Sequence, residues 1–92
     1  MEYKMTDKLQ ELLFKIIDTV GTFDSLTIKF NKELTPLIKT FKVHKNDVIQ
    51  FCNISAFTQG DNIVLIQEGQ IILILSWYDI TTIKFNWGGN KW

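Results

Sequence analysis

Near the start of the chain, apolar residues recur with the period of an α-helix. They follow one another at spacings of three and one between residues 7 and 20: Leu9, Leu12, Leu13, Ile16, Ile17 and Val20. Thr6 or Asp7 can cap the first turn, and Gly21 suits the left-handed conformation in which many helices end. The pattern predicts one amphipathic helix over residues 7–20.

After Gly21 the repeat shortens to two residues. Apolar and polar residues alternate over 26–31 and again over 80–87, which is typical of strands with one side in water. Residues 40–44 and 48–53 are predicted to form two more strands, joined by a tight reversal at the polar residues 45–47.

Residues 32–40 fit a helix, a loop or a strand. Leu34, Leu37, Ile38 and Phe41 have helical spacing, and Thr35-Pro36 could begin a helix, but a loop that leads into a strand explains the same residues. We favour a short turn.

Residues 62–77 give the clearest indication of how two segments of the chain pair. Glu68-Gly69 separates two apolar runs, so we expect a hairpin of strands 62–67 and 70–77 with a two-residue turn. The predicted register pairs Gln67 with Gln70 and Val64 with Leu73.

Both faces of this predicted hairpin are apolar. One face would carry Val64, Ile66, Ile71, Leu73, Leu75 and Trp77, and the other Ile63, Leu65, Ile72 and Ile74. Because both need cover, we expect the core on one side and either the N-terminal helix or another subunit on the other.

The first and last long strands share a repeated sequence of five residues, which we call the echo. The sequence Thr-Ile-Lys-Phe-Asn occurs at 27–31 and again at 82–86. Small barrels close by pairing their first and last strands, so the echo favours closure, although chance is an equal explanation in a chain rich in Ile and Lys.

Length and composition agree with one small β-rich domain. The 92 residues leave no room for a second core, so we expect a single domain over 1–92. Apolar residues make up 46% of the chain and Ile is frequent, which favours strands. The absence of Arg, together with many Ile, Lys and Asn, is typical of an AT-rich coding sequence such as that of a low-GC bacterium or its phages.

The formal net charge is zero, but the charges are unevenly spread. Lys29, Lys32, Lys39, Lys42 and Lys45 lie close together with only Glu33 among them. Lys39, Lys42, His44 and Lys45 are therefore candidates for binding phosphate or an acidic protein surface, although an ordinary solvated face explains them more simply.

No catalytic or metal-binding pattern is present. Cys52 and His44 are the only candidates for a nucleophile and its base, and the predicted hairpin places them too far apart; a buried Cys52 and a solvated His44 are the simpler interpretation. One Cys and one His cannot complete a zinc site. We expect no enzyme, no metal and no cofactor. Because Cys52 is the only cysteine and the first residues lack an apolar signal core, we expect a cytoplasmic protein. The zero net charge and the lack of an apolar run long enough to span a bilayer lead us to expect no membrane partner.

Aromatic residues are the other binding candidates. Trp77 and Tyr78 lie where the long hairpin ends, and Trp92 ends the chain. Such residues are common interface anchors, although core packing is the usual fate of a residue placed like Trp77.

The C-terminal part of the chain resembles a known family. Residues 61–66 and 70–82, with Tyr78-Asp79-Ile80-Thr81-Thr82 at the corner, are similar to the second motif of Sm-like proteins such as the bacterial RNA chaperone Hfq. The resemblance implies a small barrel that assembles into rings and binds RNA. Trp77 and Tyr78 stand where that family places a Lys-His pair for RNA, so stacking would have to replace the charged contacts.

We therefore expect a mainly β fold in which the helix caps a five- to six-stranded antiparallel barrel or strongly bent sheet. The first functional hypothesis is a non-catalytic interaction module that binds another protein, such as an adaptor or inhibitor encoded by a phage or mobile element. The second is an Sm-like homo-oligomer that binds RNA or single-stranded DNA through the central lysines and the corner aromatics.

Overall fold

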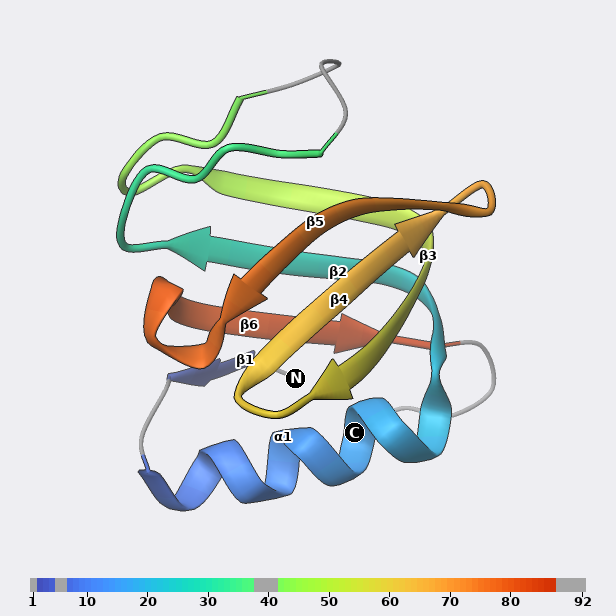
Figure 1. The fold of residues 1–92 in the computed structure, drawn as a ribbon. Coiled ribbons are helices and arrows are strands. Elements are labelled where there is room, and N and C mark those ends of the chain that lie inside the picture. Colours follow the sequence, from blue (N-terminus) through green and yellow to red (C-terminus); the bar gives the residue numbers. More distant parts are fainter. Residues whose placement is uncertain (1, 5–6, 38–41, 88–92) are drawn as a thin grey trace.

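The computed structural model describes residues 2–4, 7–37 and 42–87. It is mainly β with one α-helix, as predicted (Figure 1). Its elements are, in order, β1 (Glu2–Lys4), α1 (Asp7–Val20), β2 (Thr22–Phe30), β3 (Val48–Gln59), β4 (Asn62–Gln67), β5 (Gln70–Ser76), the 3₁₀ turn η1 (Trp77–Asp79) and β6 (Ile80–Asn86).

All described strands belong to one antiparallel sheet in the order β1-β6-β2-β3-β4-β5. The sheet bends so that β4 and β5 cross in front of β2 and β6 (Figure 1). It does not close into a barrel, so that alternative of the prediction is wrong. The two edge strands that would have to pair to close a barrel have other neighbours. Strand β1, which the sequence did not predict, pairs with β6 and forms one edge. At the other edge, β5 contacts the loop at Leu37, whose N–H donates to the Ile72 carbonyl (2.9 Å).

The helix α1 has the bounds that its apolar pattern predicts. Gly21 ends it with a φ of 74°, and its N–H donates to the Ile17 carbonyl (2.9 Å). The helix lies below the bent sheet and contributes Leu13, Ile16 and Ile17 to the core (Figure 1). The expected cover of the second hairpin face by α1 is therefore not observed.

The two echo segments pair with each other. Thr27 lies opposite Lys84, Ile28 opposite Ile83 and Lys29 opposite Thr82, in the antiparallel pairing of β2 and β6. The inferred pairing of these strands is correct, even though it does not close a barrel. Strand β2 starts at Thr22, four residues earlier than predicted, because Phe23 and Leu26 are both buried and their spacing breaks the alternation.

Strand β3 is also longer than predicted. It continues through Asn53, whose φ of 51° is left-handed, and ends at Gln59. Cys52 and Asn53 are both exposed, so the buried positions shift from Phe51 to Ile54 at this point. Asn tolerates this conformation better than most residues do, and it lets the strand bend from its pairing with β2 to its pairing with β4.

The predicted pairing of strands 40–44 and 48–53 is wrong. Residues 38–41 lie outside the described part of the chain, and Val43 forms a single bridge with Leu34. Residues 31–37 and 42–47 thus extend the β2–β3 hairpin, which explains why residues 48–53 pair with β2 instead. The reversal before β3 is present, with Asn46 at a φ of 71°.

The β4–β5 hairpin turns at Glu68-Gly69, as predicted, with both φ angles positive (54° and 76°). Gln67 pairs with Gln70 and Ile66 with Ile71, in agreement with the predicted register. A bulge then shifts the register by one residue, so that Leu65 lies opposite Leu73 and Val64 opposite Ile74. The apolar pattern could not reveal this bulge because both strands are apolar on both sides.

The bulge also corrects the predicted faces of the hairpin. The inner side carries Ile63, Leu65, Ile72, Leu73 and Leu75, all of which are buried in the core. The outer side carries Val64, Ile66, Ile71 and Ile74. Val64 is buried but lies outside the core cluster.

A tight corner joins β5 to β6. Ser76 and Asp79 form a capping box around η1: the Ser76 N–H donates to Asp79 Oδ2 (2.8 Å), and the Tyr78 N–H donates to Ser76 Oγ (3.2 Å). The corner is tied to the end of β2, because the Asn31 N–H donates to the Asp79 carbonyl (2.9 Å). These hydrogen bonds hold the backbone of Tyr78 in place.

Candidate functional site

The outer side of β3, β4 and β5 forms an apolar surface, which we call the hairpin face. Two cross-strand rows build it: Phe57, Val64 and Ile74 in one, and Ser55, Ile66 and Ile71 in the other. A third row of Gln59, Asn62 and Ser76 borders the face at one end. Cross-strand neighbours on one side of a sheet lie within contact distance, so these side chains form a continuous surface.

The hairpin face is partly exposed to water. Phe57, Ile71 and Ile74 are 41%, 44% and 45% exposed, whereas Val64 at the centre is 1% exposed. Leu37 (60% exposed) lies at the β5 edge through its hydrogen bond to Ile72. Other exposed large apolar side chains of the described chain, Val48 and Leu12, lie on the first half of β3 and on α1. A gathered apolar patch of this kind is typical of a binding surface.

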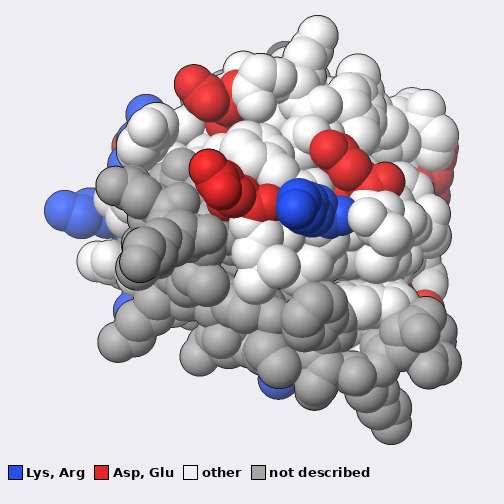
Figure 2. Space-filling view, turned by 90° about the horizontal axis from the view of Figure 1, so that it is seen from below, with Lys and Arg blue, Asp and Glu red and all other residues white. Residues whose placement is uncertain are grey.

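Charged side chains are missing from the rows of the hairpin face and occur at its borders. Glu68 lies in the turn at one end, Asp61 in the turn at the other, and Asp24 beside Asn53 across the β2–β3 register. All three are exposed. The view from below shows acidic groups and, between two of them, a basic side chain on a largely uncharged surface (Figure 2).

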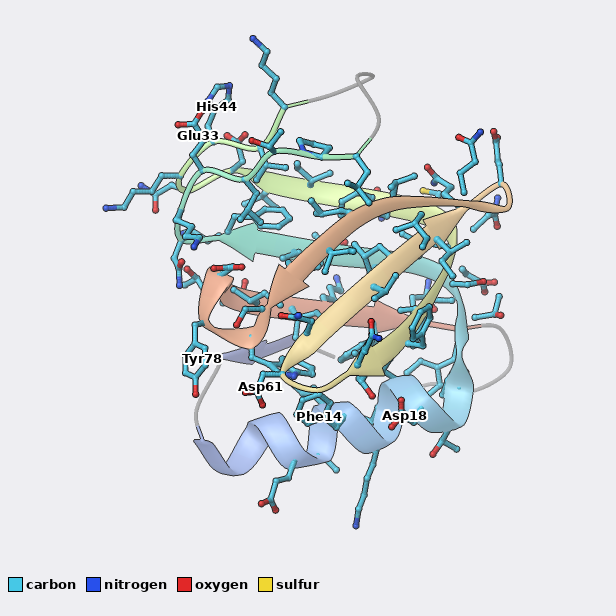
Figure 3. The ribbon with its side chains drawn as sticks, in the orientation of Figure 1. Phe14, Asp18, Glu33, His44, Asp61 and Tyr78 are labelled. Carbon is cyan, nitrogen blue, oxygen red and sulfur yellow. The ribbon has the colours of Figure 1, made fainter. Side chains whose placement is uncertain are left out.

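Tyr78 stands at the Asp61 end of the hairpin face (Figure 3). Its side chain is 70% exposed, while its carbonyl accepts a hydrogen bond from Asn31 Nδ2 (2.8 Å). An aromatic ring on a fixed backbone loses little conformational freedom on binding, which makes Tyr78 a suitable anchor.

The predicted basic group is only partly described. Lys42, His44 and Lys45 are exposed on the extension of the β2–β3 hairpin, with the buried Val43 between the first two. Lys39 lies outside the described residues. The His44 N–H donates to Asp47 Oδ2 (2.8 Å), which fixes the turn, and the His44 side chain points away from the body of the molecule near Glu33 (Figure 3).

The remaining aromatic candidates differ from Tyr78. Trp77 is 1% exposed and packs edge-on against Phe14, with ring centroids 4.7 Å apart. Its ring is thus part of the core, and we remove Trp77 from the candidate binding residues. Trp92 lies outside the described part of the chain. The sequence did not single out Phe57 or Ile74, although the apolar residues on both sides of the hairpin indicated such a face.

The remaining candidates for chemistry are Cys52 and groups of metal-ligating side chains. Cys52 is exposed, so the interpretation of a buried structural cysteine is wrong. Among residues 11–37 and 42–87, no three His, Cys, Asp or Glu side chains gather in a way that could hold a metal ion. None of the described residues forms a helix with the length and hydropathy needed to cross a bilayer.

Comparisons with protein-family models, with curated proteins and with solved structures give no match to this chain.

Proposed function

We propose that this chain is a non-catalytic interaction module that binds another protein through the hairpin face, with Tyr78 as an anchor at one end. The observation that carries the proposal is the exposure of Phe57, Ile71 and Ile74 on one continuous surface without internal charges. An adaptor or inhibitor of the kind that phages and mobile elements encode would work through such a surface.

A partner that covers these side chains would displace the water around them. Full burial of an Ile or Phe side chain contributes about 1.5–3 kcal/mol, so covering the exposed part of each of these residues would contribute roughly 1 kcal/mol. Several such contacts around the already buried Val64 resemble a hot-spot cluster, in which a few central residues supply most of the binding energy.

The experiment is a pull-down from a bacterial lysate with the wild-type chain and with Ile74→Lys. We expect the charged side chain to remove the captured partner without unfolding the domain, because Ile74 points to water. Val48→Lys is the matched control, since Val48 is an exposed apolar strand residue (63%) away from the hairpin face. Equal recovery of every partner by wild type and Ile74→Lys would exclude the hairpin face.

A second candidate function is an Sm-like homo-oligomer that binds RNA or single-stranded DNA. It is favoured by the exposure of Lys42, His44 and Lys45 on one extension, and by an element order of helix, strands and a corner before the last strand. Tyr78 could stack on a base, whereas Trp77 is buried.

Salt dependence tests this second function. Binding of a labelled oligonucleotide should weaken steeply as salt rises, and Lys42→Glu with Lys45→Glu should abolish it. The matched control is Lys15→Glu, an exposed position on α1. Absence of binding at low salt would eliminate the nucleic-acid function and leave the protein-binding function in place.

A further inference from the structure

The borders of the hairpin face indicate which kind of protein fits it. We infer that the partner presents an apolar centre surrounded by Lys or Arg side chains; this inference rests on the proposed function. It follows from two observations together: the rows of the face are uncharged, and Asp24, Asp61 and Glu68 border it.

The three carboxylates surround the face on different sides. Glu68 follows Ile66 by two residues at the hairpin turn, and Asp61 precedes the Gln59–Asn62–Ser76 row at the opposite end. Asp24 lies two residues beyond Thr22, which continues the Ser55–Ile66–Ile71 row on β2. The carboxylates of Asp61 and Glu68 thus lie beyond the two ends of the apolar rows, and that of Asp24 lies to the side, on β2.

These carboxylates are available to a partner. Asp18, Asp47 and Asp79 each contact a group of their own chain: Thr58 Oγ1, the His44 N–H and Lys32 Nζ. The carboxylates of Asp24, Asp61 and Glu68, by contrast, have neither a hydrogen bond nor an ion pair within the part of the chain that the structure describes. A basic partner would supply the missing counter-charges.

The same charges disfavour a second copy of this chain on the face. A two-fold contact between two hairpin faces would bring acidic borders together, and like charges in an interface oppose association. The lysines whose side chains the structure describes lie elsewhere: Lys29 and Lys84 on the layer of β2 and β6, Lys32, Lys42 and Lys45 on the extension of the β2–β3 hairpin, and Lys15 on α1.

The apolar centre and the charged border would contribute differently to binding. The apolar centre supplies affinity by releasing water, while border charges set the association rate and exclude partners of the wrong sign. Selection by charge at this face would explain how a small neutral protein could recognise one basic surface among many apolar ones.

The test uses two short helical peptides as probes. Both carry the same leucine stripe; in one the stripe is flanked by lysines, and in the other by glutamates. Binding to the full chain is measured by fluorescence anisotropy at low and at high salt. We expect the lysine peptide to bind roughly tenfold more tightly than the glutamate peptide at low salt, with the difference shrinking as salt rises.

Variants of the chain test whether the preference for the lysine peptide arises at the hairpin face. Asp61→Lys with Glu68→Lys should remove or reverse the preference, whereas Glu11→Lys, an exposed acid on α1, should leave it unchanged. Ile74→Lys should abolish binding of both peptides, and a scrambled lysine peptide without the stripe should bind weakly. Circular dichroism checks that each variant keeps the wild-type spectrum.

Three results would overturn the inference. Equal binding of both peptides would show an apolar site without charge selection, and binding of the lysine peptide that survives Ile74→Lys would place it elsewhere. A molecular mass that rises with concentration and falls to the monomer in Ile74→Lys would identify a second copy as the occupant. The proposed function has its own test: it is wrong if Ile74→Lys recovers the same partners from a lysate as the wild type does.

Discussion

At the scale of single residues, Leu73 and Ile74 show how differently two neighbours on one strand can act. Leu73 is 0% exposed and belongs to the core, whereas Ile74 is 45% exposed on the hairpin face. We expect Leu73→Ala to lower the free energy of unfolding by about 2–5 kcal/mol, because it leaves a cavity. Ile74→Ala should cost less than about 1 kcal/mol, because surface substitutions change stability little.

Urea denaturation of both variants measures this difference. If the two substitutions cost the same, the bulge in β5 and the assignment of its faces are incorrect.

Asp79 is the buried charged residue at the corner between β5 and β6. Its carboxylate accepts the Ser76 N–H and lies 3.2 Å from Lys32 Nζ, and its exposed fraction is 6%. Asp79→Ala removes the cap and should lower the free energy of unfolding by about 1–3 kcal/mol.

Lys32→Gln should cost less than about 1 kcal/mol, because the lysine side chain is 61% exposed and such ion pairs contribute little. Thermal unfolding of the two variants gives the comparison. A larger loss from Lys32→Gln than from Asp79→Ala would mean that the ion pair, and not the cap, holds the corner.

At the scale of elements, the turn of the β4–β5 hairpin contains a residue that disfavours its own conformation. Glu68 has a φ of 54°, where Asn is preferred, and Gly69 has a φ of 76°. Glu68→Asn should therefore raise the free energy of unfolding by about 0.5–1 kcal/mol.

Gly69→Ala tests the turn from the other side. The added methyl group meets no atom within 4 Å, so any loss of stability comes from the backbone conformation alone. We expect a loss of about 1 kcal/mol, measured by urea denaturation. If Glu68→Asn lowers stability, the Glu68 side chain contributes more to the turn than its backbone strain costs. Glu68→Asn should also weaken binding of a basic partner, which makes the stabilised variant a separate check on the acidic border.

At the scale of the whole molecule, the two functional candidates imply different assemblies. Acidic borders on the hairpin face favour a chain that stays monomeric until a different protein covers that face. Light scattering over a wide concentration range should then give the mass of one chain, 10.8 kDa. A constant multiple of that mass would favour the Sm-like ring and count against the free hairpin face.

The local sequence determined several elements of this protein because their causes are local. The helix α1 follows from apolar residues at helical spacing and from Gly21 as its cap. The hairpin turn follows from Glu68-Gly69, and the apolar character of both hairpin sides follows from the residue types of the two strands. The basic extension and the exposed Tyr78 were likewise marked by residue type alone.

Tertiary structure decided what those elements do together, because the deciding contacts join residues far apart in the chain. The bulge at Ile72, the bend at Asn53 and the pairing of β1 with β6 leave no periodic trace in the sequence. Phe57 and Ile74 share one surface only because β4 lies between their strands. Alternation predicts which residues are apolar, whereas register and curvature decide which of them face water, and here they leave one apolar face open.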